Sequence, residues 1–138
     1  MINIEQELIE EEGLSLEPYT DSLGNLTVGV GHLIKSDCGI ISLKYAGELL
    51  AEDIKIATND CRWNIPFFNE LDEVRQYVLI DMCFNLGIKK LLGFKKMLLA
   101  LQNKNYVVAS NEMKNSLWHK QVKSRAIKLE NCMKNGTL

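Results

Sequence analysis

Residues 12–33, EGLSLEPYTDSLGNLTVGVGHL, contain the clearest change of pattern in this chain of 138 residues. The first part is extended in character, residues 21–25 have the composition of a turn, and residues 26–31 alternate apolar side chains with Thr or Gly. Such alternation around a turn predicts a β-hairpin. Glycines within a strand mark a bulge or a close approach of the backbone, so Gly29 and Gly31 indicate a crowded return strand.

A short amphipathic helix is expected before the hairpin, with Asn3 as its N-cap and Gly13 as its end. Three consecutive acidic residues, Glu10, Glu11 and Glu12, fall on its last turn. That position is unfavourable for carboxylates, because the negative end of the helix dipole lies there and the three charges repel one another. We therefore expect something other than helix stability to account for at least one of them.

A long helix is predicted after the hairpin, capped by Ser42 and continuing to about Asp60. Asp53 falls within the apolar stripe of this helix, and a carboxylate in such a place needs a partner. His32 is the candidate partner, in a structural pair. The alternative is that Asp53 lies at the solvated edge of the stripe.

The rest of the chain is predicted to be helical. Asp72 caps residues 73–86, which are apolar on nearly all sides and are therefore the expected centre of a helical bundle. Further helices are expected at 94–102, 106–118 and about 122–134. The predicted fold is α+β: one domain over residues 1–138, with a small N-terminal lobe carrying a hairpin or short antiparallel sheet, a long connecting helix and a larger all-helical lobe. The lobes are placed at about 13–60 and about 65–138, with the helix of residues 3–12 packing against the second.

Composition adds limits to the function. With 46% hydrophobic and 25% charged residues the chain is globular, which excludes disordered, collagen-like and disulfide-scaffold proteins. The net charge of −2 gives no argument for nucleic acid as a partner. That total conceals a division, because residues 1–64 carry a formal −8 and residues 65–138 a formal +6. The two halves are expected to meet different partners.

The N-terminus, MINIEQELIEEE, is acidic where a secretory signal would be basic and then apolar, and no run approaches the length of a membrane span. We therefore expect a protein without a signal peptide, made in a cytoplasm and not inserted into a membrane. The four cysteines are far apart in the sequence and are expected to be reduced and mostly in the core, rather than in a metal or redox site. No metal and no cofactor are expected.

Glu12, Asp21 and Thr27 form a candidate site within the N-terminal stretch. Eight residues separate Glu12 from Asp21, and five separate Asp21 from Thr27. Each residue alone has an ordinary explanation, since Asp forms turns and Thr is common in strands. Their joint spacing favours the interpretation that Glu12 and Asp21 are a pair of catalytic carboxylates.

This pattern resembles the phage-type lysozymes, the endolysins of glycoside hydrolase family 24, and most closely their T-even phage members. In that family a Glu, an Asp and a Thr at this spacing cleave the β-1,4 bond between N-acetylmuramic acid and N-acetylglucosamine in peptidoglycan. The resemblance covers nearly the whole chain. It continues in residues 28–33 (VGVGHL), 42–53, 71–75 (LDEVR), 84–87 (FNLG), 93–94 (GF), Trp118 and 124–126 (SRA).

The resemblance implies a role for each residue. Glu12 is the general acid, Asp21 orients or activates the attacking water, and Thr27 helps to hold that water, with inversion at the anomeric carbon. One carboxyl must stay protonated and the other ionised for such chemistry. Leu33 and Phe84 match positions that line the saccharide cleft, with plain packing as the alternative.

For two further residues within the resemblance we expect structural roles: packing for Trp118, and a helix cap or ion pair for Arg125. Met97 and Glu112 replace smaller or neutral residues of the T-even members, so contacts to the stem peptide need not be retained. The chain is also shorter than those members between Leu33 and Leu71.

The resemblance further implies a monomer with peptidoglycan as its substrate, held in the host cytoplasm until a holin allows it to reach the wall. The lysines of the basic half are candidates for binding peptide carboxylates of the wall, or are simply solvated helix faces. Two other functions remain open. A lytic transglycosylase needs only the acid Glu12, and a catalytically inactive wall-binding module would retain the fold alone.

Overall fold

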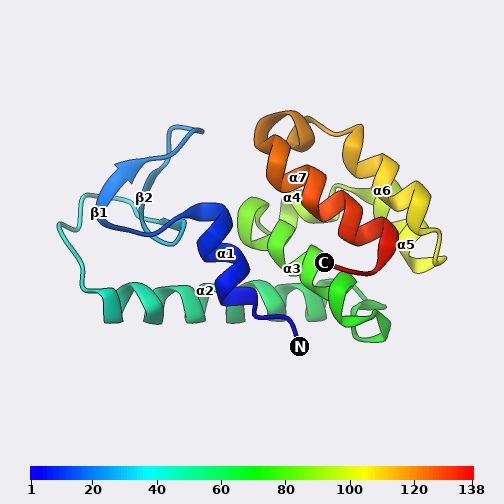
Figure 1. Ribbon diagram of the computed structural model, residues 1–138, viewed down its shortest axis with the longest axis horizontal. Coiled ribbons are helices and arrows are strands. Elements are labelled where there is room, and N and C mark those ends of the chain that lie inside the picture. The colour runs from blue at the N-terminus through cyan, green and yellow to red at the C-terminus, as the bar shows by residue number, and fades with distance from the viewer. The chain divides into compact units, whose positions relative to one another are not determined.

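The computed structural model describes all residues, 1–138, and divides into two compact units, Asn3–Ile56 and Ala57–Leu138 together with Met1–Ile2 (Figure 1). The first unit contains α1 (Ile4–Glu12), β1 (Ser15–Thr20), β2 (Leu26–Gly29), β3 (His32–Leu33) and the first part of α2 (Leu43–Asn64). The second contains the end of α2, a short 3-10 helix η1 (Phe68–Glu70), α3 (Glu73–Leu86), α4 (Ile88–Leu92), α5 (Lys95–Gln102), α6 (Tyr106–Lys114) and α7 (Leu117–Asn135). These elements confirm the expected α+β fold.

The ends of α1 follow the local sequence signals. The Asn3 side chain accepts a hydrogen bond from the Gln6 amide at 3.1 Å, which supplies one of the partners that the first turn of a helix lacks. Gly13 ends the helix with φ +74°, and its N–H donates to the Ile9 carbonyl at 2.9 Å. Glu12 is thereby fixed as the last residue of α1.

The sheet has three antiparallel strands in the order β1-β2-β3, so the predicted hairpin is confirmed and extended by a two-residue strand. The β1–β2 register shifts between Ser15 and Tyr19, and Tyr19 then lies opposite Thr27. In the second ladder Thr27 lies opposite Leu33. The irregularity matters because β1 advances four positions between these pairs while β2 advances two, which places Tyr19 opposite Thr27 instead of Asn25.

His32 and Asp53 form the predicted pair. His32 Nδ1 lies 2.6 Å from Asp53 Oδ2, and both side chains are partly buried. The contact ties β3 to α2, whose first turn is capped by Ser42 through a 3.0 Å hydrogen bond from the Tyr45 amide. The helix continues beyond the predicted end near Asp60 to Asn64.

The helix α3 is the buried centre of the second unit, as its all-round apolar sequence predicts. Asp72 caps it by accepting from the Arg75 amide at 3.1 Å, and Gly87 ends it. The helices α5, α6 and α7 follow as consecutive neighbours, α5 against α6 and α6 against α7 (Figure 1). Three of the four cysteines are buried free thiols, and Cys38 is exposed.

Two of the predicted helix boundaries are wrong. The helix expected over 106–118 ends at Lys114, because Ser116 begins a new helix by accepting the His119 amide at 3.2 Å. Trp118 therefore lies in the first turn of α7. The break expected near residues 120–121 is a kink at Lys123 within α7. The short helix α4 was not predicted, and its Leu91 is completely buried.

Trp118 and Arg125 have the structural contacts expected of them. The Trp118 indole N–H donates to Asn85 Oδ1 at 2.8 Å, and its ring meets Phe94 edge to face with centroids 6.2 Å apart. Arg125 Nε lies 2.8 Å from Oδ1 of the fully buried Asp81, which confirms the ion pair. These contacts hold α7 to α3.

Arg75 binds the last turn of α7. Its guanidinium donates to the carbonyls of Met133 at 2.7 Å and Lys134 at 3.2 Å, and lies 3.3 Å from the centroid of the Tyr106 ring. These bonds satisfy carbonyls that the end of a helix leaves without partners. Gly136 follows in the left-handed conformation, and a Cβ there would lie 2.9 Å from Arg75 Nη1.

None of the helices is long and apolar enough to cross a membrane.

Candidate active site

Glu12 has a local environment that differs from that of Glu10. Its carboxyl group lies against the backbone of Gly31, where a Cβ atom would come within 2.9 Å of both Cδ and Oε2 of Glu12. Glu10, by contrast, is exposed and accepts a hydrogen bond from Gln6 Nε2 at 3.1 Å. The glycine of the return strand thus leaves room for the Glu12 side chain, which explains one of the glycines that the sequence marked as unusual.

A small cavity of about 230 Å³ adjoins Glu12. Its other lining residues are Gly13, Leu14, Ser15 and Tyr19, which come from the end of α1 and from β1. Local chain geometry brings them together, because Gly13 at φ +74° turns the chain sharply from the helix into the strand. The cavity gives the Glu12 side chain an opening within the first unit.

Asp21 is held by the turn between β1 and β2. Its Oδ1 atom accepts the amides of Leu23 at 2.9 Å and Asn25 at 2.8 Å, so the turn-forming role expected for Asp is confirmed. The Oδ2 atom makes no hydrogen bond within the protein. One oxygen therefore fixes the carboxylate in place while the other is available to a ligand.

Thr27 lies in the middle of β2 and is only 1% exposed. Its hydroxyl donates to the Asn25 carbonyl at 2.9 Å. Because a hydroxyl has one proton and two lone pairs, this bond leaves Thr27 Oγ1 as a hydrogen-bond acceptor for anything that reaches it. Asp21 and Thr27 are thus both fixed through the same turn residue, Asn25.

Tyr19 lies within electrostatic reach of both candidate carboxylates, and sequence reasoning missed it. Burial raises the pKa of the Tyr19 phenol above its usual value, and the negative charges of Glu12 and then Asp21 raise it further. Tyr19 also faces Thr27 across the β1–β2 ladder. The available signal was the two-residue strand period, which places Tyr19 and Asp21 on one side of an extended chain.

The two candidate saccharide-binding residues belong to different units. Leu33 is 61% exposed on β3, directly opposite Thr27 in the ladder, so an apolar side chain there is open to solvent. Phe84 is half-buried on α3. Their role in binding saccharide stays a prediction.

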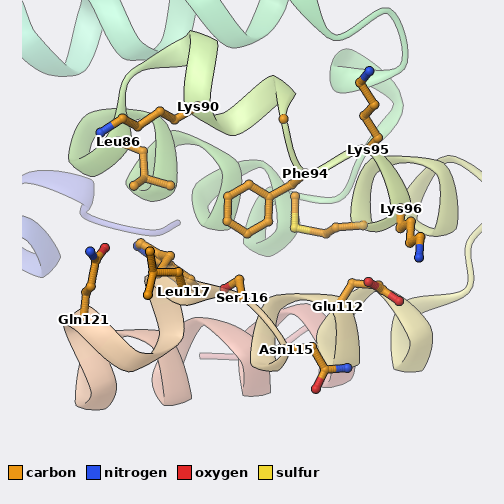
Figure 2. A pocket seen from close by; sticks show the side chains of 13 residues that line it. Leu86, Lys90, Phe94, Lys95, Lys96, Glu112, Asn115, Ser116, Leu117 and Gln121 are labelled. Atoms are coloured by element: carbon orange, nitrogen blue, oxygen red, sulfur yellow. The ribbon is translucent and has the colours of Figure 1, made fainter.

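The second unit has a larger cavity of about 660 Å³ (Figure 2). Phe94 and Trp118 contribute aromatic surface, and Lys90, Lys95 and Lys96 contribute positive charge. The two residues noted as departures from the T-even members also line it: Met97, which is buried, and Glu112, which projects from α6 (Figure 2). Several basic residues of this half thus gather around one apolar hollow.

A short antiparallel sheet, a long helix leading into a helical unit, and a glutamate at the end of the first helix define a lysozyme-like protein of the α+β class. The sequence model of the phage lysozyme family matches residues 9–131 of this chain. The chain therefore belongs to the phage lysozyme family, a class of peptidoglycan-degrading hydrolases. The resemblance drawn from the sequence is confirmed.

The curated relatives include a probable T4-type lysozyme 1 of Dictyostelium discoideum, 29% identical over 163 residues, with 99% of this chain and 96% of that protein covered. The endolysin of Salmonella phage P22 is 33% identical over 133 residues, covering 88% and 84%. The pre-baseplate central spike protein Gp5 of Enterobacteria phage T4 is 26% identical over 157 residues, which are 95% of this chain but 27% of that protein. The similarity therefore extends over 96% of the first of these proteins and 84% of the second, but over 27% of the larger phage protein.

Proposed function

We propose that this protein hydrolyses the β-1,4 bond between N-acetylmuramic acid and N-acetylglucosamine in bacterial peptidoglycan. The observation that carries the proposal is the grouping around β1 and β2: Glu12 beside a cavity, Asp21 with a carboxylate oxygen available, and Thr27 with an acceptor hydroxyl. The grouping occurs in a chain of the phage lysozyme family. It supplies two carboxylates of different surroundings, as glycoside hydrolysis requires.

In the proposed reaction Glu12 is the general acid. It gives its proton to the oxygen of the glycosidic bond, and the bond electrons pass to that oxygen as the leaving sugar departs. The anomeric carbon becomes positively charged in the transition state, and the Asp21 carboxylate stabilises that charge.

Asp21 and Thr27 together direct the attacking water. A water molecule has two protons, and Asp21 Oδ2 and Thr27 Oγ1 are both acceptors, so the two side chains can bind both protons and leave an oxygen lone pair for the anomeric carbon. As the new bond forms, one water proton passes to Asp21. Attack from the face opposite the leaving group inverts the anomeric configuration.

The remainder of the proposal concerns binding and release. The two units act as one lysozyme-like domain, a monomer, with Leu33 and Phe84 contacting saccharide. The basic side chains of the second unit bind carboxylates of the wall peptides. The protein stays in the host cytoplasm until a holin lets it reach the wall.

The test is muropeptide analysis after digestion of purified peptidoglycan with the wild type and with Glu12→Gln. We expect products with a reducing muramic acid end from the wild type and none from the variant. Glu10→Gln is the matched control, because it removes a neighbouring exposed charge from the same helix turn and should cleave normally.

Other products would identify the alternatives. A 1,6-anhydro muramic end would identify a lytic transglycosylase instead of a hydrolase. Binding to the wall without cleavage by the wild type would leave the inactive wall-binding module. A Glu12→Gln protein that still cleaves would remove Glu12 from the role of acid.

A further inference from the structure

We propose that Tyr19 is a positioning residue for Glu12, and that its hydroxyl donates a hydrogen bond to the Glu12 carboxylate formed when the acid gives up its proton. The inference rests on the proposed function and adds a fourth side chain to it. It concerns the moment at which Glu12 becomes ionised as the glycosidic bond breaks.

The cavity brings the two side chains to one place. Glu12 and Tyr19 line the same hollow of about 230 Å³, one from the end of α1 and the other from β1. Gly31 limits the Glu12 carboxyl on another side, since it lies in contact with that group. Tyr19 therefore brings a phenol donor to the same hollow that the Glu12 side chain adjoins.

The sheet fixes Tyr19 with respect to Thr27. Directly opposed residues of an antiparallel ladder have side chains on the same face, about 5 Å apart at their Cβ atoms. Tyr19 and Thr27 are such a pair. The register shift between Ser15 and Tyr19 produces this alignment, so the position of the phenol depends on the bulge.

The charges around the phenol support a donor role. Glu12 from α1 and Asp21 from the turn are the charged groups that act on it, and together with burial they hold the pKa of Tyr19 above its usual value. The phenol therefore keeps its proton throughout the range in which a carboxyl acid works. It makes no hydrogen bond within the resting protein, so its proton is uncommitted until a new acceptor forms.

The proposed step moves no proton from Tyr19. Glu12 transfers its proton to the glycosidic oxygen, the bond between that oxygen and the anomeric carbon breaks, and water adds to the carbon while giving a proton to Asp21. The phenol only shares its proton with the new Glu12 carboxylate. Afterwards Asp21 loses its proton to solvent and Glu12 regains one.

The first test compares Tyr19→Phe with wild type on a soluble peptidoglycan fragment. Loss of one hydrogen bond in the transition state should lower kcat about tenfold, with KM unchanged. The alkaline limb of the pH–rate profile should move to higher pH, because the ionised form of the acid loses a donor. Tyr45→Phe, an exposed tyrosine of α2, is the matched control and should leave both unchanged.

A second test is independent of activity. Ionisation of Tyr19, assigned by difference from Tyr19→Phe in ring-labelled protein, should occur at lower pH in Glu12→Gln than in wild type, because a neighbouring negative charge has been removed. Asp21→Asn should cause a smaller shift in the same direction, and Glu10→Gln none.

The outcomes separate the two proposals. An active wild type together with a Tyr19→Phe enzyme of normal kcat and pH profile overturns the role of Tyr19 and leaves the proposed function intact. An inactive wild type ends the proposed function. A Tyr19 titration that is insensitive to Glu12→Gln overturns the positioning role whatever the activity.

Discussion

The carboxyl group of Glu12 lies directly against Gly31, so that a Cβ on residue 31 would stand 2.9 Å from Glu12 Oε2. Gly31 has φ +64°, a left-handed conformation in which any other residue is strained. Glycine is therefore needed at position 31 for two reasons: the backbone turn between β2 and β3 has a positive φ, and the proposed acid needs the space that a Cβ would occupy.

Gly31→Ala should lower wall-clearing activity by at least tenfold, because the added methyl displaces the Glu12 carboxyl and misplacement of a catalytic group is costly. The backbone strain should also reduce the free energy of unfolding by about 1 kcal/mol. Gly29→Ala is the matched control, since Gly29 has nearly the same φ of +65° but a Cβ there would meet its nearest neighbour, Ala46, at 3.7 Å. Equal activity of the two variants would contradict the role of the Gly31 contact.

Asp21→Asn should separate structure from chemistry. The amide oxygen of Asn can accept the same hydrogen bonds from the Leu23 and Asn25 amides, so the melting temperature should stay within a few degrees of wild type. The activity should fall about 100-fold or more, because an amide cannot take a proton from water. Asp21→Ala, which also removes the turn bonds, should lose stability as well. Normal activity of Asp21→Asn would exclude the carboxylate from the reaction.

Thr27→Val and Thr27→Ser test whether the hydroxyl matters. Valine keeps the shape but leaves the Asn25 carbonyl without its donor, and serine keeps the hydroxyl but loses a buried methyl, so each should cost about 1 kcal/mol of stability. Only the valine variant should lose activity strongly, by tenfold or more, because it has no acceptor for the water. Parallel thermal melts and product assays measure both quantities. A valine variant as active as the serine variant would remove Thr27 from the mechanism.

His32→Asn should lower the melting temperature at neutral pH, because it breaks the 2.6 Å contact with Asp53 that ties β3 to α2. Both side chains are partly buried, so the expected cost is about 1–2 kcal/mol, or several degrees in a protein of this size. Asp53→Asn and the double variant complete a cycle that isolates the pair from other effects. An unchanged midpoint, or strictly additive costs, would mean that the contact contributes no net stability.

Wall binding through the basic side chains should depend on salt. Lysis should slow as NaCl is raised from about 0.05 to about 0.2 M, since screening shortens the reach of surface charges. Lys95 and Lys96 line the larger cavity, and replacing both by Gln should flatten this dependence. The pair Lys104 and Lys134, changed in the same way, provides a control of equal charge. A flat profile in the wild type would favour lysines that are simply solvated.

Much of the fold was predictable because its signals act over a few residues. The caps at Asn3, Ser42 and Asp72 all form the side-chain bonds that their residue types favour. The pair of His32 and Asp53 was also predictable, although its partners are far apart in sequence, because a carboxylate on an apolar stripe needs compensation. A buried carboxylate must be hydrogen-bonded or paired with a charge, and this requirement leaves few possible partners for Asp53.

The missed features depend on contacts between distant segments. Ser116 could have continued the preceding helix or begun a new one. In the structure it begins α7, and Trp118 is buried in the first turn of that helix. Arg75 has no local signal for closing the end of α7, and it reaches Met133 across 58 positions. Glu130 is 1% exposed, and its Oε2 lies 2.5 Å from His119 Nδ1 on the other side of the kink at Lys123, so this contact depends on the kink within α7.

For the candidate site, the sequence alone determined the residue types, the spacing of Glu12, Asp21 and Thr27, and the turn that holds Asp21. Only the tertiary structure placed Tyr19 beside Glu12 and opposite Thr27, and only it showed that Gly31 leaves space for the acid. The physical reason is the register of the sheet. A single irregularity between Ser15 and Tyr19 decides which residues lie opposite one another, and it forms only when the two strands pair.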